Sequence, residues 1–410
     1  MSDLKSRVFK RYNPIGVDEI EAVNRVLESG VLSDFYGTWS KKFYGGDRVK
    51  KLEEYCSKIF DVKHVISVNS WTSGLECAVG AIGVSPEDEI ITTPWTMSAT
   101  AISILHWNAI PVFCDISPDS YNIDPHLIEK HITSKTKAIM SVDIFGQSAD
   151  VTKINEIAKK YHLKVISDCA QAIWSNFNNK KSGTLTDIGG YSLNYHKHIN
   201  CGEGGLIVTD DDNLADNCRL IRNHAESVVT GMKKTDLNNM IGHNFRMGEI
   251  EAAISLCQLE KLPMLASKRK EMGDYLSNNL SIIDCIKVPE VNQNSDNVYY
   301  VFPIQLFLSK LKCNRKEFIK SLEDHGVPGV FEGYQNLHTL PVFQQKRAFG
   351  NTNFPWTNSN IDYKKGICPV AEDLHDNSFI GLNMCLYDFS MDDIQLISNA
   401  IIDVASKFQK

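Results

Sequence analysis

The chain has 410 residues, of which 43% are hydrophobic and 23% are charged. These proportions are ordinary for a globular protein, and the length exceeds what one small core organises, so we expect two unequal domains. The net charge of −7 comes without a basic stripe, which argues against a nucleic-acid partner.

Apolar periodicity first predicts a helix over residues 17–29 that ends at Gly30, then a loop over 30–46 and a helix over 49–60. From residue 65 onward, short apolar strands alternate with helices. The predicted strands are 65–69, 89–93, 110–114, 138–142 and 165–167, and the helices between them are 73–82, 98–106, 125–131 and 151–161. This alternation is typical of an α/β fold, with a mostly parallel sheet covered by helices on both faces.

Ligands bind beyond the carboxyl ends of the strands in such sheets. Asn69 is the last residue of the first predicted strand, and Asp115, Asp143 and Asp168 follow directly after three others. We therefore expect a polar site at this edge of the sheet.

The pattern changes near residue 190. Two short strands, 190–193 and 205–209, flank a loop, and helices follow at 212–223 and 247–262. The remaining segment predicts a strand over 300–307 and helices over 315–324 and 391–408. We place the division at residue 265, with a large domain over 1–265 and a smaller α+β domain over 266–410.

The eleven cysteines form no CxxC pair and no framework spacing, which indicates reduced thiols. Residues 1–7 lack the apolar core of a signal peptide. The apolar stretch 90–114 is interrupted by Pro94, His106 and Asn108, so it does not predict a membrane span. Together these features predict a cytoplasmic protein without a membrane partner.

Lys197 is the candidate catalytic residue. It lies in the loop between the strands 190–193 and 205–209, just before the Gly-rich turn 202–205. A lysine there suits a Schiff base, and Asp168 at the end of an apolar strand suits the partner of a pyridinium nitrogen, a pairing that points to pyridoxal 5′-phosphate (PLP). The alternatives are a solvated lysine and a carboxylate in a helix cap or an ion pair.

A phosphate site is predicted at the strand-to-helix junction 69–74, where a helix N-terminus presents free amides to an anion. Thr72 and Ser73 add hydroxyls there, although plain helix capping explains them equally well. Ser192 supplies another hydroxyl from the lysine's own strand, and Gln171 is placed to donate to the phenolic oxygen of the cofactor.

Two other ligand classes are disfavoured. The glycines of 202–205 form no GxGxxG and precede a strand, which argues against a dinucleotide site and a nicotinamide-dependent oxidoreductase. His196 and His198 flank Lys197, but no third ligand lies nearby in the sequence, so we expect no metal site.

The pattern S-x-N-x-x-K over 192–197, followed by G-E-G-G and preceded by D-C-A-Q-A over 168–172, resembles the DegT/StrS family of PLP-dependent sugar aminotransferases. The resemblance extends from Gly30 to the C-terminal helix and implies the aspartate aminotransferase-like fold, fold type I. It also implies a homodimer with shared active sites.

The resemblance assigns roles residue by residue. Lys197 is similar to the Schiff-base lysine and proton shuttle, and Asp168 to the pyridinium partner. The residues implied to contact the cofactor are Thr72, Ser73, Met97, Gln171, Ser192 and, from the neighbouring subunit, Asn244. Those implied to face the substrate are Asn194, Tyr334 and His338. Two positions depart from the family, because Met97 stands where an aromatic ring often stacks on the cofactor and Asn194 stands where histidine is usual.

The expected function is a ping-pong transamination. An amino acid, glutamate or glutamine, gives its nitrogen to the bound cofactor, and a nucleotide-linked keto-sugar then accepts it, in the biosynthesis of an amino sugar or surface glycan. Small keto-phosphates, keto-octulosonates and keto-cyclitols remain open as acceptors. A sugar dehydratase of the same fold, which carries histidine at the lysine position, and a non-catalytic sugar-binding regulator are the alternatives.

Overall fold

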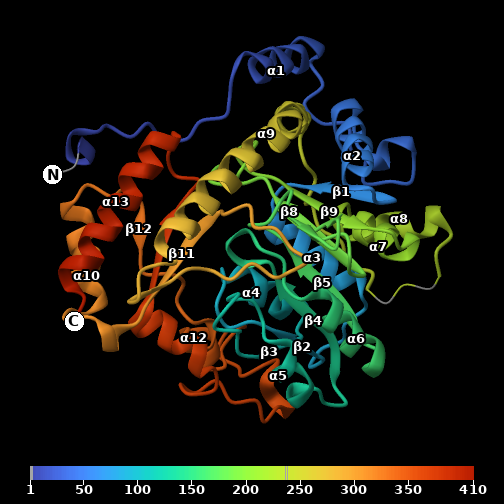
Figure 1. Cartoon of the computed structure of the whole chain (residues 1–410). Helices are drawn as coiled ribbons and strands as arrows, with labels where there is room; N and C mark the ends of the chain where they lie inside the picture. Colours follow the sequence, from blue (N-terminus) through green and yellow to red (C-terminus); the bar gives the residue numbers. More distant parts are fainter. Residues whose placement is uncertain (1–2, 236, 238) are drawn as a thin grey trace.

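The computed structural model describes residues 3–235, 237 and 239–410, which form two β-sheets linked by one long helix (Figure 1). The larger sheet has seven strands in the order β1-β9-β8-β5-β4-β2-β3. Their bounds are β1 His64–Val68, β2 Glu89–Thr92, β3 Ile110–Phe113, β4 Thr136–Val142, β5 Lys164–Asp168, β8 Ile188–Ser192 and β9 Gly205–Thr209. Strands β8, β5, β4, β2 and β3 pair in parallel, whereas β9 runs antiparallel to both of its neighbours. The predicted mostly parallel sheet is confirmed.

Helices cover both faces of this sheet because its strands send alternate apolar side chains into two cores. On one face lie α3 (Trp71–Ala81), α4 (Ala99–His106) and α7 (Asp212–Arg222), packed on Ile66, Ile166 and other strand residues. On the opposite face lie α2 (Asp47–Phe60), α6 (Val151–Tyr161) and the first half of α9 (Glu249–Leu280). A one-residue slip of any strand would exchange its two faces, so burial fixes the register that positions the strand ends.

The smaller sheet is antiparallel and has the order β10-β11-β13-β12. Its strands are β10 Ile286–Lys287, β11 Val301–Leu306, β12 Val330–Phe331 and β13 Phe379–Asn383, with α10 (Arg315–Asp324) and α13 (Met391–Phe408) packed against it. Strand β13 was not predicted, although it pairs with both β11 and β12. It is short and contains Gly381, where a Cβ would lie 2.4 Å from the ring of Phe331. Because close packing requires glycine there, the segment lacks the usual sequence pattern of a strand.

Helix α9 is much longer than the predicted helix over 247–262. The apolar pattern breaks at Pro263, which has no N–H to donate, yet the helix continues through it to Leu280. Leu259 packs in the core of the large sheet, and Leu276 packs in the core of the small one. The division at 265/266 therefore falls inside a continuous helix, and the domain boundary stays a prediction.

The N-terminal segment packs against the C-terminal unit rather than against the large sheet. Leu4 is buried in the core of the small sheet, and the carbonyl of Lys10 accepts a hydrogen bond from the amide of Asp388. The chain then reaches α1 (Val17–Ser29), which extends to the outside of the molecule and packs on α9 (Figure 1). Gly30 ends α1 in the left-handed region with φ 68°, as the sequence predicts.

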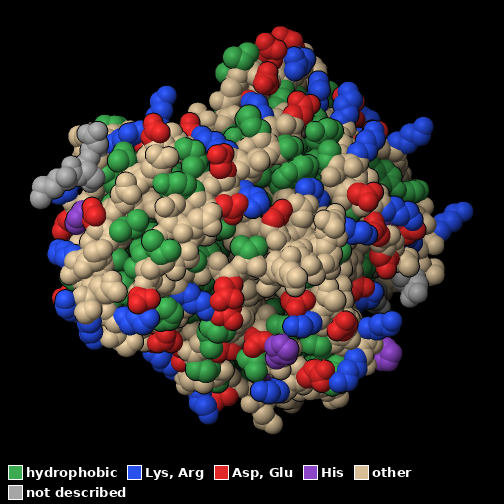
Figure 2. Space-filling model, in the orientation of Figure 1, with side chains coloured by type: hydrophobic (Ala, Val, Ile, Leu, Met, Phe, Trp, Pro, Cys, Tyr) green, Lys and Arg blue, Asp and Glu red, His purple; other side chains and the backbone are tan. Residues whose placement is uncertain are grey.

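The remaining helices and strands are short. They are α5 Pro125–Ile128, α8 Ala225–Met232, α11 Pro341–Gln344, α12 Pro369–Asp373, β6 Asn176–Phe177 and β7 Lys180–Lys181. On the face drawn in Figure 2, basic and acidic side chains are interspersed. Among the residues described above, no helix combines the length and the apolarity that crossing a membrane requires.

Candidate active site

A cavity of about 170 Å³ lies beyond the carboxyl ends of the central strands of the large sheet. A water molecule occupies about 30 Å³, so the cavity has room for a small molecule. The register of β4, β5 and β8 aligns Val142, Asp168 and Gly190, which brings segments far apart in the sequence to one place. Eight of the residues predicted from the sequence line the cavity: Thr72, Met97, Asp168, Gln171, Ser192, Asn194, Lys197 and Tyr334.

Lys197 is held in the β8–β9 loop, where its amide donates to the carbonyl of Asn194 at 3.0 Å. Its side chain is buried, and its Nζ lies 4.4 Å from the centre of the Tyr300 ring. Burial lowers the pKa of Lys197 to about 8, although the charge of Asp168 opposes that shift. An amine with a lowered pKa is more often unprotonated, and only the unprotonated amine attacks an aldehyde.

Both oxygens of the Asp168 carboxylate already accept hydrogen bonds. Oδ1 accepts from Nε1 of Trp71 at 2.7 Å and from the amide of Ala170 at 3.2 Å, and Oδ2 accepts from Oγ1 of Thr100 at 2.8 Å. A carboxylate has about four acceptor positions, so one position on Oδ2 remains. This free acceptor position fits the protonated ring nitrogen of PLP. Trp71 and Thr100 were not predicted, because they lie 97 and 68 positions from Asp168 in the sequence.

The N-terminus of α3 meets the cavity, and here Ser70 is the helix cap while the hydroxyl of Ser73 binds to Asn69. The Oγ of Ser70 accepts from the amide of Ser73 at 3.1 Å, and the Oγ of Ser73 donates to Oδ1 of Asn69 at 2.7 Å. Ser73 is therefore absent from the lining of the cavity, whereas Thr72 and Ser192 belong to it. The helix terminus and these two hydroxyls suit an anion such as a phosphate.

Gln171 links the large sheet to a loop of the smaller unit. Its Oε1 accepts from the amide of Phe145 at 2.9 Å, which fixes the orientation of the side-chain amide, and its Nε2 donates to the hydroxyl of Tyr334 at 3.0 Å. Burial raises the pKa of Tyr334 to about 12, so this phenol stays protonated at neutral pH. Tyr334 and Gln171 thus form one wall of the cavity.

Polar residues lie at the outer part of the cavity. Nδ2 of Asn194 donates to Oε1 of the exposed Glu203 at 2.8 Å. His196 also lines the cavity, and burial lowers its pKa to about 4, so it is neutral at physiological pH. Met97 is 55% exposed, whereas Trp95 is fully buried and donates to the carbonyl of Tyr334. His196 and Glu203 lie close to Lys197 in the sequence, which was the only signal available for them.

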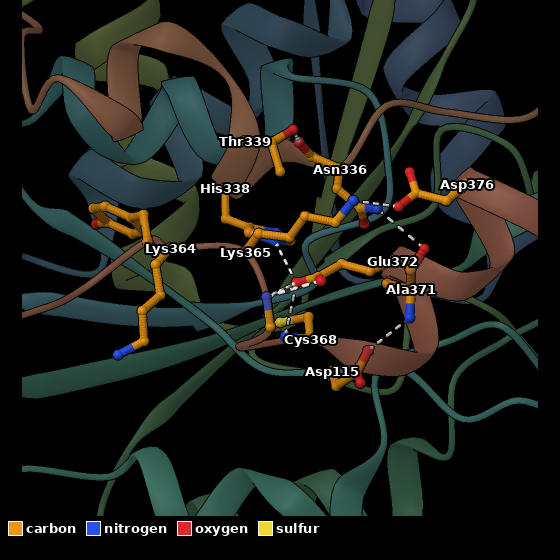
Figure 3. Close-up of polar contacts among 12 residues, drawn as sticks. Asp115, Asn336, His338, Thr339, Lys364, Lys365, Cys368, Ala371, Glu372 and Asp376 are labelled. Carbon is orange, nitrogen blue, oxygen red and sulfur yellow. Dashed lines mark hydrogen bonds and ion pairs between the residues drawn. The ribbon is translucent and has the colours of Figure 1, made fainter.

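His338 is absent from the lining of the cavity, although it was predicted to face the substrate. It is fully buried, and its Nε2 lies 2.9 Å from Oε1 of Glu372 (Figure 3). Glu372 also accepts from the amides of Gly366 and Cys368. Burial lowers the pKa of His338, so the neutral ring donates to the carboxylate and ties the loop before α11 to α12.

Asn244 also lies apart from the cavity. Its side chain is exposed, and its Oδ1 accepts from Nε of Arg246 at 2.7 Å. Its predicted role is in the site of a neighbouring subunit. A single chain does not test that role, and it stays a prediction.

A mostly parallel seven-stranded sheet, a buried lysine on the β8–β9 loop and a carboxylate at the end of β5 define a fold type I aminotransferase. The chain belongs to the DegT/DnrJ/EryC1/StrS aminotransferase family, whose sequence profile matches residues 15–378.

Known relatives agree with this assignment. The spore coat polysaccharide biosynthesis protein SpsC of Bacillus subtilis is 30% identical over 370 residues, which cover 88% of this chain and 92% of the relative. GDP-perosamine synthase of Caulobacter vibrioides is 36% identical over 300 residues, which cover 72% of this chain and 77% of that protein. The structure of Helicobacter pylori PseC, an aminotransferase involved in the biosynthesis of pseudoaminic acid, superposes with a TM-score of 0.80 at 28% identity and covers 98% of this chain and 99% of PseC.

Proposed function

We propose that this protein is a PLP-dependent transaminase that moves an amino group from glutamate or glutamine to the keto group of a nucleotide-linked sugar. The observation that carries the proposal is that Lys197 and Asp168 line one cavity, with the N-terminus of α3 at its edge. Family membership and relatives such as GDP-perosamine synthase support the reaction and the class of acceptor. The product would be an amino sugar for a surface glycan.

When PLP is bound, its protonated ring supplies an electron sink for the carbanion formed during amino transfer. Lys197 would hold the aldehyde carbon covalently and, once released, carry a proton between the two carbons that exchange the nitrogen. Asp168 would keep the ring nitrogen protonated through the free position on Oδ2. Gln171 would donate to the phenolic oxygen, and Thr72 and Ser192 would bind the phosphate.

The acceptor would enter past the polar residues at the outer part of the cavity. Asn194 and Glu203 offer a donor and an acceptor for sugar hydroxyls, and Tyr334 adds a protonated phenol. The role of His338 toward the substrate stays a prediction. We propose that this role is indirect, because His338 supports the loop that carries Tyr334.

We further propose that the enzyme is a homodimer in which Asn244 contacts the phosphate of the partner's cofactor. Met97, which lines the cavity, and Tyr195, which lies between two lining residues in the sequence, are 55% and 67% exposed in the single chain, and exposed apolar side chains around a site often mark an interface. A cytoplasmic location is consistent with the 11 cysteines, all of which are free thiols.

Reduction of the PLP-loaded protein with borohydride, followed by peptide mapping, tests the central step. We expect the reduced cofactor on Lys197. A cofactor bound but unattached would favour the dehydratase of the same fold, and a protein that stays colourless with PLP would favour a sugar-binding regulator.

Transfer of labelled nitrogen from glutamate to a panel of keto-sugars then identifies the acceptor. The panel should include nucleotide-linked ketoses, keto-phosphates, keto-octulosonates and keto-cyclitols. Transfer to a free keto-phosphate but to no nucleotide-linked sugar would contradict the proposed acceptor class while leaving the transaminase intact.

A further inference from the structure

Trp71 is the first residue of α3, and its indole reaches the carboxylate of Asp168. The side chain is 4% exposed, and Nε1 lies 2.7 Å from Oδ1. A hydrogen bond to a charged acceptor is about twice as strong as one between neutral groups. Trp71 therefore contacts the residue that faces the ring nitrogen of the proposed cofactor.

Three glycines make room for Trp71. A Cβ on Gly190 would lie 2.1 Å from Cζ3 of the indole, and a Cβ on Gly74 would lie 2.5 Å from Cε3. A Cβ on Gly205 would lie 2.7 Å from the backbone nitrogen of Trp71. Contacts this short do not occur between real atoms, so β8, α3 and β9 each omit a side chain where Trp71 lies. Gly190 is also the pairing partner of Asp168 across β5 and β8.

The indole N–H restrains a torsion that is otherwise soft. The terminal torsion of an aspartate is broad and roughly two-fold, so a carboxylate needs donors to define its plane. Trp71 and Thr100 donate to opposite oxygens of Asp168 at 2.7 and 2.8 Å. Without the indole N–H, Oδ1 would keep only the amide of Ala170 at 3.2 Å. The remaining acceptor position on Oδ2 would then lose its fixed direction.

We propose that Trp71 is a positioning residue, whose indole N–H fixes the plane of the Asp168 carboxylate so that Oδ2 faces the ring nitrogen of PLP. The inference rests on the proposed function, since it assigns the ring of PLP to this cavity. It adds a role for Trp71 that differs from packing, because packing requires the indole shape and the proposed role requires its N–H.

The test compares the PLP-loaded wild type with Trp71→Phe. The matched control is Trp107→Phe, since Nε1 of Trp107 donates to the carbonyl of Glu76 at 2.7 Å, outside the lining of the cavity. The readout is the pH midpoint of the visible absorption of the cofactor attached to Lys197. A ring nitrogen that is less firmly protonated withdraws fewer electrons from the attached nitrogen, which then holds its proton to higher pH.

For Trp71→Phe we expect the midpoint to move upward by at least about half a pH unit and the dissociation constant of PLP to rise about tenfold. Trp107→Phe should leave both unchanged. A second variant carries benzothienylalanine at position 71, which keeps the bicyclic shape and replaces the N–H with sulfur. It should show the same upward shift even if Trp71→Phe folds poorly.

A midpoint equal to that of the wild type in the benzothienylalanine protein would overturn the inference and leave Trp71 with a packing role only. That result leaves the proposed function intact, because the wild type still attaches PLP. A wild type that develops no visible absorption with PLP would instead overturn the proposed function, and the inference with it.

Discussion

The amine of Lys197 lies 4.4 Å from the centre of the Tyr300 ring, and this contact joins the two β-sheet units at the active site. Lys197 comes from the β8–β9 loop of the large sheet, whereas Tyr300 directly precedes β11 of the small one. The ring covers the amine and contributes to the burial that lowers its pKa to about 8. The smaller unit thus helps to set the reactivity of a lysine that belongs to the larger one.

The first prediction concerns the pH dependence of cofactor attachment. The unprotonated fraction of Lys197 increases as pH rises through about 8, so the rate at which the apoenzyme attaches PLP should rise over that range and level off above it. Stopped-flow absorbance at a series of pH values measures this rate. A rate that is already level at pH 6 would show that the amine is far less basic than burial implies.

Replacing Tyr300 with alanine should move that midpoint to higher pH. Water would reach Lys197, the desolvation that lowers its pKa would weaken, and the pKa would return toward its ordinary value. Tyr300→Phe is the matched control, because it keeps the ring over the amine and should keep the midpoint. Equal midpoints in the alanine and phenylalanine variants would show that the ring of Tyr300 does not lower the pKa of Lys197.

Asp168→Asn should separate binding from turnover. The amide has a similar shape and can still contact the cofactor, so PLP binding should persist in part. It cannot act as a counter-ion for a protonated ring nitrogen, so kcat should fall by at least about 100-fold, the usual cost of removing one electrostatic partner of a transition state. Equilibrium titration with PLP and steady-state kinetics give the two quantities, and near-normal kcat would contradict the assigned role.

Mixing two inactive variants tests the shared site. In a dimer with shared sites, Lys197→Ala and Asn244→Ala remove groups that different subunits contribute to each site. After unfolding and refolding together, half of the dimers should be mixed and each should contain one intact site, so about a quarter of wild-type activity should return. No recovery from a mixture whose refolded dimers are confirmed by native mass spectrometry would place both residues in the same subunit's site.

Glu372→Ala tests the support of the loop that carries His338. The carboxylate accepts from His338 and from the amides of Gly366 and Cys368, and removing it leaves the buried donors of His338 and Cys368 without this partner. The free energy of unfolding should fall by about 2–4 kcal/mol, with little change in PLP binding. Denaturant titration measures the loss.

The control is Asp376→Ala, which removes the partner of the exposed Lys365 in the same part of the molecule (Figure 3) and should change stability by less than about 0.5 kcal/mol. If Glu372→Ala kept wild-type stability but raised KM for the acceptor, His338 would regain a direct role in binding the substrate.

Much of the large sheet follows from local sequence. Short apolar segments that alternate with amphipathic helices have one stable arrangement, a parallel sheet covered on both faces, and the predicted strand 165–167 ends one residue before β5 ends at Asp168. Lys197 was found for a related reason, since a Gly-rich turn next to it marks an irregular loop. Such signals need only neighbouring residues.

Other features depended on partners far away in the chain. The sequence pattern ends the long helix near Pro263, but packing against both cores carries α9 on to Leu280. Strand β13 exists because β11 and β12 lie on either side of it. His338 stands in a segment similar to substrate-facing segments of the family, yet Glu372 holds it in the interior.

The residues alone therefore determined the class of fold, the lysine and the carboxylate, because each has a signature within a few positions of itself. Only the tertiary structure decided which donors hold that carboxylate and which aromatic ring covers the amine. Trp71, Thr100 and Tyr300 come from separate elements, and their hydrogen bonds and contacts arise when strand register and core packing bring those elements together.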